Sequence, residues 1–215
     1  MKIKAVLFDM DGVLLDTEKY LTKYIREAAK EFGYDMSEEV SYTLRSFAAP
    51  YANQELKRIY GKDFEYLPIR KRKQEMMKEH LEKYGLETKP DVEEVVTELK
   101  RRGYKVAVVT ATNETRAREY LEMAGFDELF EEIISGSMVD RGKPFPDVYD
   151  YACQELHAQP EECVAIEDSP NGVSSAYAAG CNVIMVPDLT QPDAWIEKRI
   201  YAKADRLLDL LDILK

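Results

Sequence analysis

Residues 1–12 read MKIKAVLFDMDG, and the architecture of the chain can be inferred outward from them. Residues 2–8 form a short apolar run rich in Val, Ile and Leu that ends at a D-G pair, which predicts a buried strand. A strand buried on both faces belongs to a parallel sheet covered by helices. The adjacent sequence offers no partner strand, so we expect this strand to join a sheet formed much later in the chain.

The next segment, residues 18–84, has no strand signals and reads as a series of amphipathic helices separated by Gly33, Pro50, Gly61 and Pro68. After Pro90 the pattern becomes an alternation of helices and short apolar strands. Such alternation predicts an α/β fold with a parallel sheet wrapped by helices. We predict helices at 92–102, 114–124, 147–156 and 172–179, and strands at 104–110, 132–135, 163–167 and 182–186.

These two patterns together predict two domains. Residues 1–16 and 87–215 would form the α/β core, and residues 17–86 would form an inserted helical domain, called the cap below. We expect the two connections, residues 14–17 and 85–90, to act as hinges.

The composition excludes several classes of partner. The chain has 215 residues, of which 45% are hydrophobic and 33% charged, with a formal net charge of -11 and a pI of about 4.9. An acidic chain offers no general surface for nucleic acid or for an anionic membrane. No run reaches membrane-spanning length. Cys153, Cys163 and Cys181 lack metal-ligand spacing, so we expect reduced thiols in the cytoplasm. Separately, we expect a monomer.

Polar residues follow several of the predicted strands. Ligands of open parallel sheets bind beyond the carboxyl ends of the strands, so these residues are candidates for one site. A lysine in a Gly-Lys-Pro segment precedes the helix that leads to the 163–167 strand. We add this lysine to the candidates. The candidates are Asp9, Asp11, Gly12, Thr110, Ala111, Thr112, Asn113, Lys143, Glu167, Asp168 and Ser169.

Each candidate alone has a simpler explanation. The Asp11-Gly12 pair fits a hairpin turn, and Asn113 fits a helix N-cap. Lys143 fits a solvated surface lysine, and residues 167–169 fit a turn. These explanations are independent of one another, whereas a single phosphoryl-transfer site accounts for all the residues together.

The chemistry assigns a role to each aspartate of the first strand's end. Asp9 is ionised at neutral pH and can attack phosphorus, which divides the reaction into two steps through an acyl phosphate. Asp11 can protonate the leaving oxygen and later take a proton from water. That role requires a protonated Asp11 in the first step, which repulsion from nearby carboxylates favours.

The same site needs positive charge to hold a phosphate. Asp9, Asp168 and a backbone carbonyl near Asp11 form a hard oxygen set suited to Mg²⁺, and Glu167 could bind it directly or through water. Lys143 would place a point charge on the phosphate. The Thr110 hydroxyl and the Ala111 amide would donate hydrogen bonds to phosphate oxygens.

The segments FDMDG, VVTATN, GKPFPD and IEDSPNG resemble the four successive motifs of the haloacid dehalogenase superfamily. The insertion after the first motif, together with LLDTE, is most similar to the β-phosphoglucomutase-like branch. The resemblance implies a Rossmann-like core with a helical cap and a sugar phosphate or other small phosphorylated metabolite as substrate. It implies Asp9 as nucleophile, Asp11 as acid/base, and Thr110 and Lys143 as phosphate ligands. It also places Glu167 and Asp168 beside the metal.

Comparison with two other kinds of member in the superfamily favours a phosphatase. Asp11 argues against removal of halide, because halide-removing members lack the second aspartate. True β-phosphoglucomutases carry a cap histidine and a Lys-Gly loop, where this chain has Leu21 and residues 44–49. We therefore predict a magnesium-dependent phosphatase that acts through an aspartyl phosphate. An intramolecular phosphomutase and a non-catalytic binding module remain as alternatives.

The roles of Arg45 and of the basic run at residues 70–73 are less clear from the sequence. Arg45 fits a substrate contact and a solvated helix residue equally well, and we place it with Thr112 and Asn113 among the candidate phosphate- or substrate-binding residues. The run at residues 70–73 lies beside Glu75 and Glu79, so we interpret it as salt pairs on a helix face.

Overall fold

The computed structural model describes residues 2–215 of the chain. Across these residues six strands form one sheet in the order β3-β2-β1-β4-β5-β6, and every neighbouring pair is parallel. The first strand lies inside the sheet, between two strands that come more than ninety residues later. The strands are β1 Ala5–Phe8, β2 Lys105–Thr110, β3 Glu132–Ser135, β4 Cys163–Glu167, β5 Asn182–Met185 and β6 Ala202–Lys203.

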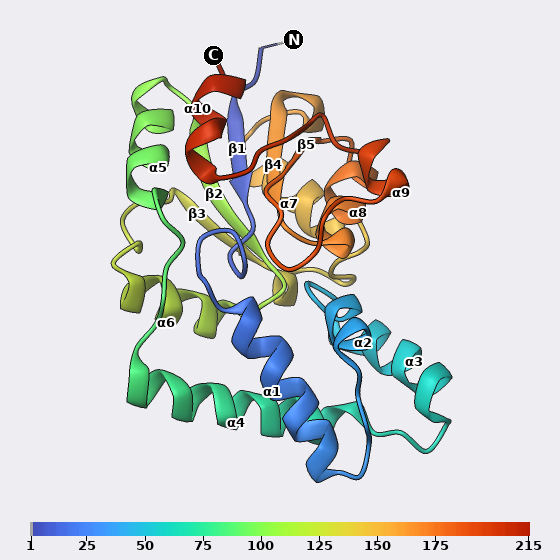
Figure 1. The fold of residues 1–215 in the computed structure, drawn as a ribbon. Coiled ribbons are helices and arrows are strands. Elements are labelled where there is room, and N and C mark those ends of the chain that lie inside the picture. The colour runs from blue at the N-terminus through green and yellow to red at the C-terminus, as the bar shows by residue number, and fades with distance from the viewer. Residues whose placement is uncertain (1) are drawn as a thin grey trace.

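The helices form two groups along the chain. The first group, α1 to α4, follows β1 without an intervening strand, and the second group alternates with the strands (Figure 1). The first group is α1 Glu18–Glu31, α2 Glu38–Thr43, α3 Ala49–Tyr60 and α4 Tyr66–Tyr84. The second group is α5 Val92–Arg101, α6 Glu114–Ala124, α7 Asp147–Glu155, α8 Pro170–Ala178, α9 Ala194–Glu197 and α10 Leu210–Ile213, with short 3-10 turns at Gly136–Met138, Pro160–Glu162 and Leu207–Asp209.

The sheet buries both of its faces. Successive residues of a strand point to opposite faces, and β1 follows this rule: Val6 and Phe8 pack into one hydrophobic cluster, and Ala5 and Leu7 pack into another. The first cluster includes residues of α5, α6 and α10, and the second includes residues of α7 and α8 (Figure 1). A strand covered on both sides has no polar face, which explains its continuous apolar sequence.

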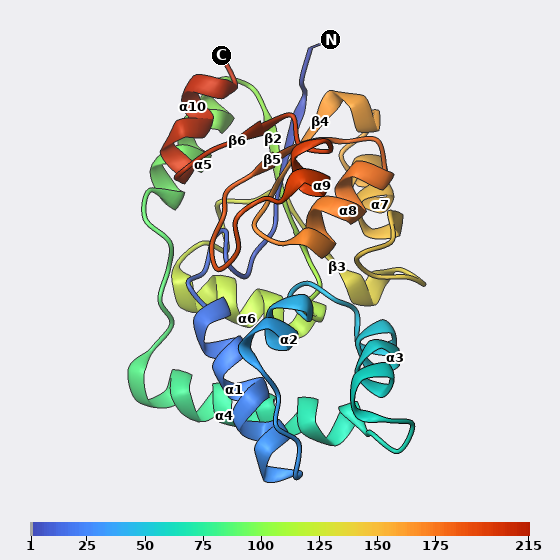
Figure 2. The same cartoon turned by 45° about the vertical axis from the view of Figure 1, so that its right-hand side comes forward.

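Helices α1 to α4 have a hydrophobic core of their own. It is a separate cluster that includes Ile25, Leu56, Phe64 and Ile69, all of which are buried. Figure 2 shows these helices as a layer beyond the carboxyl ends of the strands. The structure therefore places the cap over the edge of the sheet where the candidate residues begin.

The two connections between core and cap pair with each other. Leu15 and Thr88 form an antiparallel bridge, and the Lys89 amide donates to the Leu14 carbonyl at 2.9 Å. Gly85 ends α4 with a φ of +80°, a value that proline cannot adopt. Substitution of Gly85 by proline would therefore disrupt the end of α4, and it cannot serve as a way to stiffen the hinge at residues 85–90.

The predicted fold class, a Rossmann-like parallel sheet with an inserted helical cap, is confirmed. The predicted boundaries at residues 16–17 and 86–87 stay a prediction. The strand β6 and the helices α9 and α10 were not predicted, because segments of two to four residues carry no measurable periodicity. Within residues 2–215 no helix combines the length and the apolar character needed to span a membrane.

Candidate active site

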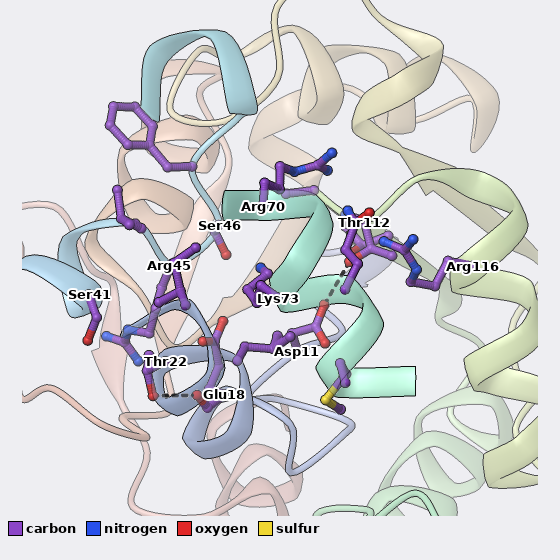
Figure 3. Close-up of a pocket in the computed structure, with 18 of the residues that line it drawn as sticks. Asp11, Glu18, Thr22, Ser41, Arg45, Ser46, Arg70, Lys73, Thr112 and Arg116 are labelled. Carbon is purple, nitrogen blue, oxygen red and sulfur yellow. Dashed lines mark hydrogen bonds between the residues drawn. The ribbon is translucent and has the colours of Figure 1, made fainter. Parts of the chain in front are cut away.

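The candidate residues meet at the carboxyl edge of the sheet. Phe8 pairs with Val108 of β2 and with Ile166 of β4, so the next residue, Asp9, emerges between the ends of those two strands. Thr110 ends β2 and Glu167 ends β4. Asp9, Asp11 and residues 110–112 line one cavity together with residues of the cap (Figure 3).

Lys143 is a buried lysine at the centre of this edge. Its ammonium donates to Asp9 Oδ1 and Glu167 Oε1, both at 2.7 Å, and to the carbonyl of Val109 at 2.9 Å. Burial lowers the pKa of this lysine, but the two carboxylates raise it by more, so the net shift is upward and the ammonium stays charged. The surface-lysine explanation is therefore wrong, since the side chain is not exposed.

Three carboxylates form a cluster that fits a divalent cation. One oxygen each of Asp9, Glu167 and Asp168 lie within 4.8 Å of one another, and all three residues are buried. Glu167 Oε2 and Asp168 Oδ1 have no hydrogen-bond partner within residues 2–215. Burial, with Asp9 nearby, raises the pKa of Glu167 to about 7. Burial also raises the pKa of Asp168 well above its ordinary value, with Glu18 and Asp9 adding to the shift. Unpartnered hard oxygens of this kind match the ligand preference of Mg²⁺.

Two glycines leave the room that these acids need. A Cβ at Gly172 would lie 1.8 Å from Glu167 Oε2, and a Cβ at Gly12 would lie 2.5 Å from Asp168 Oδ2. Gly12 also has a φ of +87°, a backbone angle that residues with a side chain rarely adopt. The glycines of FDMDG and SPNG are thus required by the packing of the acids.

Asp11 differs from Asp9 in its surroundings. The hydroxyls of Thr17 and Thr112 donate to its carboxyl oxygens at 2.6 and 3.0 Å, so Thr17 does not use its side chain to cap α1. Burial raises the pKa of Asp11, the two hydroxyls oppose that shift, and the Asp9 carboxylate adds to it. The net shift is upward, which favours the protonated acid. Asp11 lies outside the three-acid cluster, and a ligand role for its backbone carbonyl stays a prediction.

The loop between α2 and α3 reaches from the cap into the core. Arg45 Nη1 contacts Asp168 Oδ2 at 2.9 Å, and the side chain is buried. Ser46 Oγ lies 3.5 Å from Asp9 Oδ2, and the Ala48 amide donates to the Lys143 carbonyl at 3.0 Å. The solvated explanation for Arg45 is therefore wrong, and a contact with substrate stays a prediction.

Of the four candidates that follow β2, three line the cavity and one does not. Thr110 Oγ1 accepts from the Thr112 amide at 3.0 Å, and both residues line the cavity with Ala111. Asn113 does not line it; its side chain accepts from the Arg116 amide and caps α6. A direct phosphate contact by Asn113 therefore gains no support from the geometry.

Sequence reasoning missed several residues of the cavity. Glu18, the last residue of LLDTE, is buried there, and burial together with Asp11 raises its pKa to about 8. Tyr149, behind the cavity wall, was missed as well, and its hydroxyl donates to Glu167. The basic run of α4 was only partly interpreted correctly. Arg72 does form salt bridges with Glu31, Glu75 and Glu79, but Arg70 and Lys73 face the cavity.

A family model described as haloacid dehalogenase-like hydrolase matches residues 6–186. The chain belongs to this family. It is 33% identical over 217 residues to Protein CbbY of Cereibacter sphaeroides, covering 96% of this chain and 92% of that protein. It is 30% identical to a phosphorylated carbohydrates phosphatase of Thermotoga maritima, covering 97% and 98% of the two chains.

The solved structures agree with this membership. The chain matches beta-phosphoglucomutase of Clostridium difficile with a TM-score of 0.80 and 21% identity, covering 97% of this chain and 93% of that one, which shows a common fold. A putative beta-phosphoglucomutase of Bacteroides vulgatus is 28% identical, with a TM-score of 0.82, covering 98% of this chain and 87% of that one. The resemblance to the β-phosphoglucomutase-like branch of the family is thereby confirmed. The prediction of an enzyme, a phosphoric monoester hydrolase of the family, is confirmed as well.

Gly172→Ala tests the packing around Glu167. The added methyl displaces the Glu167 carboxylate from Lys143, so we expect a loss of stability of about 1–3 kcal/mol and a fall in aryl phosphate turnover of about a hundredfold. Gly136→Ala is the control, because its Cβ would meet its nearest atom at 3.6 Å. Denaturant unfolding and steady-state kinetics measure both effects. Wild-type turnover in a folded Gly172→Ala protein would contradict this account of the site.

Glu18→Gln tests the buried acid. The pKa of Glu18 is raised from its ordinary 4.5 to about 8, so between these pH values the folded protein holds a proton that the unfolded chain has released. Wild-type stability should therefore fall relative to the variant as pH rises across this range, by up to ~1.4 kcal/mol per pH unit. Urea unfolding at several pH values measures the difference. Glu119→Gln, at an exposed position, is the control, and parallel curves for wild type and Glu18→Gln would refute the prediction.

Proposed function

We propose that the protein is a magnesium-dependent phosphatase that hydrolyses a small phosphorylated metabolite through a phosphorylated Asp9. The observation that carries the proposal is the contrast between two aspartates in one cavity. Asp9 is paired with a charged lysine at 2.7 Å, whereas the pKa of buried Asp11 is raised. One group is suited to attack and the other to donate a proton.

In the first step an Asp9 oxygen bonds to phosphorus while the bond from phosphorus to the leaving oxygen breaks. Asp11 gives its proton to that oxygen, and the alcohol departs. Lys143 fixes the Asp9 carboxylate through Oδ1, which leaves Oδ2 for the attack. Thr110 and Ala111 line the cavity, and the Thr110 hydroxyl and the Ala111 amide would donate to the phosphate oxygens.

In the second step water bonds to phosphorus and gives a proton to the Asp11 carboxylate. The bond between phosphorus and Asp9 breaks, and both aspartates return to their starting states with release of inorganic phosphate. Bound Mg²⁺ would offset the negative charge that the phosphate adds to this acidic edge. Asp9, Asp168 and the backbone carbonyl of Asp11 would hold it, with Glu167 binding directly or through water.

Several observations support a small substrate. The cavity lies between the core and the cap, and its wall combines the polar residues with apolar side chains such as Leu21, Ile25, Leu44 and Met77. The relative from Thermotoga maritima is a phosphatase of phosphorylated carbohydrates. A sugar phosphate is the class that fits both. A monomeric state and a cytoplasmic location also stay predictions, the second resting on the three free cysteines.

A mutase is the second candidate, and the lining of the cavity disfavours it. Leu21 stands where a mutase would carry a histidine, and this side chain has no proton to exchange. The phosphomutase and the binding module thus become outcomes of the assay below.

The deciding assay incubates the protein with a panel of sugar phosphates and Mg²⁺, and measures free phosphate and positional isomers together. We expect free phosphate, its loss in excess chelator, and its return when Mg²⁺ is added. Isomers without free phosphate would establish the mutase instead. Neither product would leave only binding, and full activity in chelator would reject the metal.

Substitutions separate the roles of the two aspartates. Asp9→Asn should abolish both turnover and covalent phosphate labelling, because an amide oxygen is a poor nucleophile. Asp11→Asn should lose turnover by about 10²–10⁴-fold, yet retain labelling by an aryl phosphate whose leaving group needs little protonation. Asp205→Asn, at a side chain that is 87% exposed, is the control. Mass spectrometry of the labelled peptide locates the phosphate, and its appearance on Asp11 would reverse the assignment.

A further inference from the structure

A side chain of the core holds the backbone of the loop between α2 and α3, residues 43–48. The side-chain nitrogen of Asn171 donates to the carbonyls of Thr43 and Arg45, at 2.9 and 2.8 Å. Thr43 is the last residue of α2, and the final carbonyls of a helix have no partner within it. Asn171 supplies the donor that the end of α2 lacks, so the beginning of the loop is bound to the core.

The other end of the loop meets the core at the segment that carries Lys143. The Ala48 amide donates to the Lys143 carbonyl at 3.0 Å. Ala48 also approaches Gly142 closely, because a Cβ added at Gly142 would lie 3.0 Å from the Ala48 Cβ. The loop is therefore fixed to the core at both ends, on segments that also carry the candidate residues Lys143 and Asp168.

The middle of the loop has a conformation that requires such support. Ser46 has a φ of +56°, in the left-handed region that residues with a side chain rarely adopt. A backbone in that region costs free energy and persists only where the surrounding structure fixes it. The hydrogen bonds of Asn171 and Ala48, one at each end of the loop, supply this constraint.

The docked loop places two side chains at the catalytic edge. Ser46 Oγ lies 3.5 Å from Asp9 Oδ2. The Arg45 guanidinium contacts Asp168 Oδ2 at 2.9 Å and the hydroxyl of Thr190. Arg45 and Ser46 both line the cavity, as Figure 3 shows. The loop thus forms the part of the cavity wall that lies beside Asp9.

We propose that Asn171 is a positioning residue, which docks the loop at residues 43–48 on the core so that Arg45 and Ser46 close the cavity beside Asp9. Asn171 does not line the cavity itself, so it acts through the loop. Its role in the reaction rests on the proposed function, because the wall that the loop forms would contact the leaving group of a sugar phosphate. A small acyl phosphate such as acetyl phosphate would reach little of that wall.

Amide hydrogen exchange measures docking without turnover. The acceptor of the Ala48 amide lies in the core, so the protection of this amide reports whether the loop is docked. Asn171→Ala removes two hydrogen bonds, and we expect the Ala48 amide to exchange about tenfold faster while amides within α3 keep their protection. Asn182→Ala is the matched control, because Asn182 also donates to two carbonyls, at 3.0 and 3.2 Å, but at the amino end of β5. It should leave the exchange of Ala48 unchanged.

Gly142→Ala loosens the loop at its other end and tests the same docking with Asn171 intact. The added methyl would lie 3.0 Å from the Ala48 Cβ, so we expect faster exchange of the Ala48 amide in this variant as well. Gly136→Ala, whose Cβ would meet its nearest atom at 3.6 Å, should not change it. Wild-type protection of Ala48 in a folded Asn171→Ala protein would overturn the proposal, and so would an equal loss of protection throughout α3.

Kinetics test whether docking serves the reaction. We expect Asn171→Ala to lower kcat/KM about tenfold for the sugar phosphate that the panel identifies, and less than about threefold for acetyl phosphate. Equal losses for the two substrates, or wild-type turnover of the sugar phosphate, would overturn the positioning role. A wild-type protein that hydrolyses neither substrate would refute the proposed phosphatase, and the exchange of Ala48 would still decide whether Asn171 docks the loop.

Discussion

Everything at the catalytic edge depends on one buried ammonium group. Lys143 stands among carboxylates that topology forces together, because β1 and β4 are neighbours and both end in acids. Without its charge, Asp9 and Glu167 would face each other in a region of low dielectric constant, where like charges cannot both stay ionised. The lysine forms an ion pair with Asp9, whereas burial raises the pKa of Asp11, which Lys143 does not contact.

The cap completes this balance of charge from the other side. Arg45 supplies a cation to Asp168, while Arg70 and Lys73 supply cations further along the cavity. The cap thus places positive charge beside the acids of the core. The core contributes Asp9 and Asp11 to the cavity, and the cap contributes further cations to the same cavity.

The sequence predicted the core of the site better than its cap. The acids follow strands whose apolar runs are clear, and the rule for parallel sheets brings strand ends together without further information. Lys143 precedes the helix that leads to one of these strands. The basic run of α4 has no such rule. Arg70, Lys73 and Gln74 share one side of the helix and Arg72 points elsewhere, but which side meets the cavity depends on how α4 packs against α1. For Arg116 and Arg118 as well, the sequence does not show which side of the helix meets the cavity. Strand β6 escaped prediction for another reason, because a segment of two residues carries no periodicity.

The pairing of residues 14–15 with residues 88–89 has a consequence for how such proteins diversify. The chain leaves the core and comes back at adjacent points, so the two ends of the intervening segment are neighbours whatever lies between them. Helices of another number or length can be joined at the same ribbon if they replace the contacts that Arg45 and Ala48 make with Asp168 and Lys143. The insertion is therefore an exchangeable module, and recombination at this ribbon can give one catalytic core a new range of substrates.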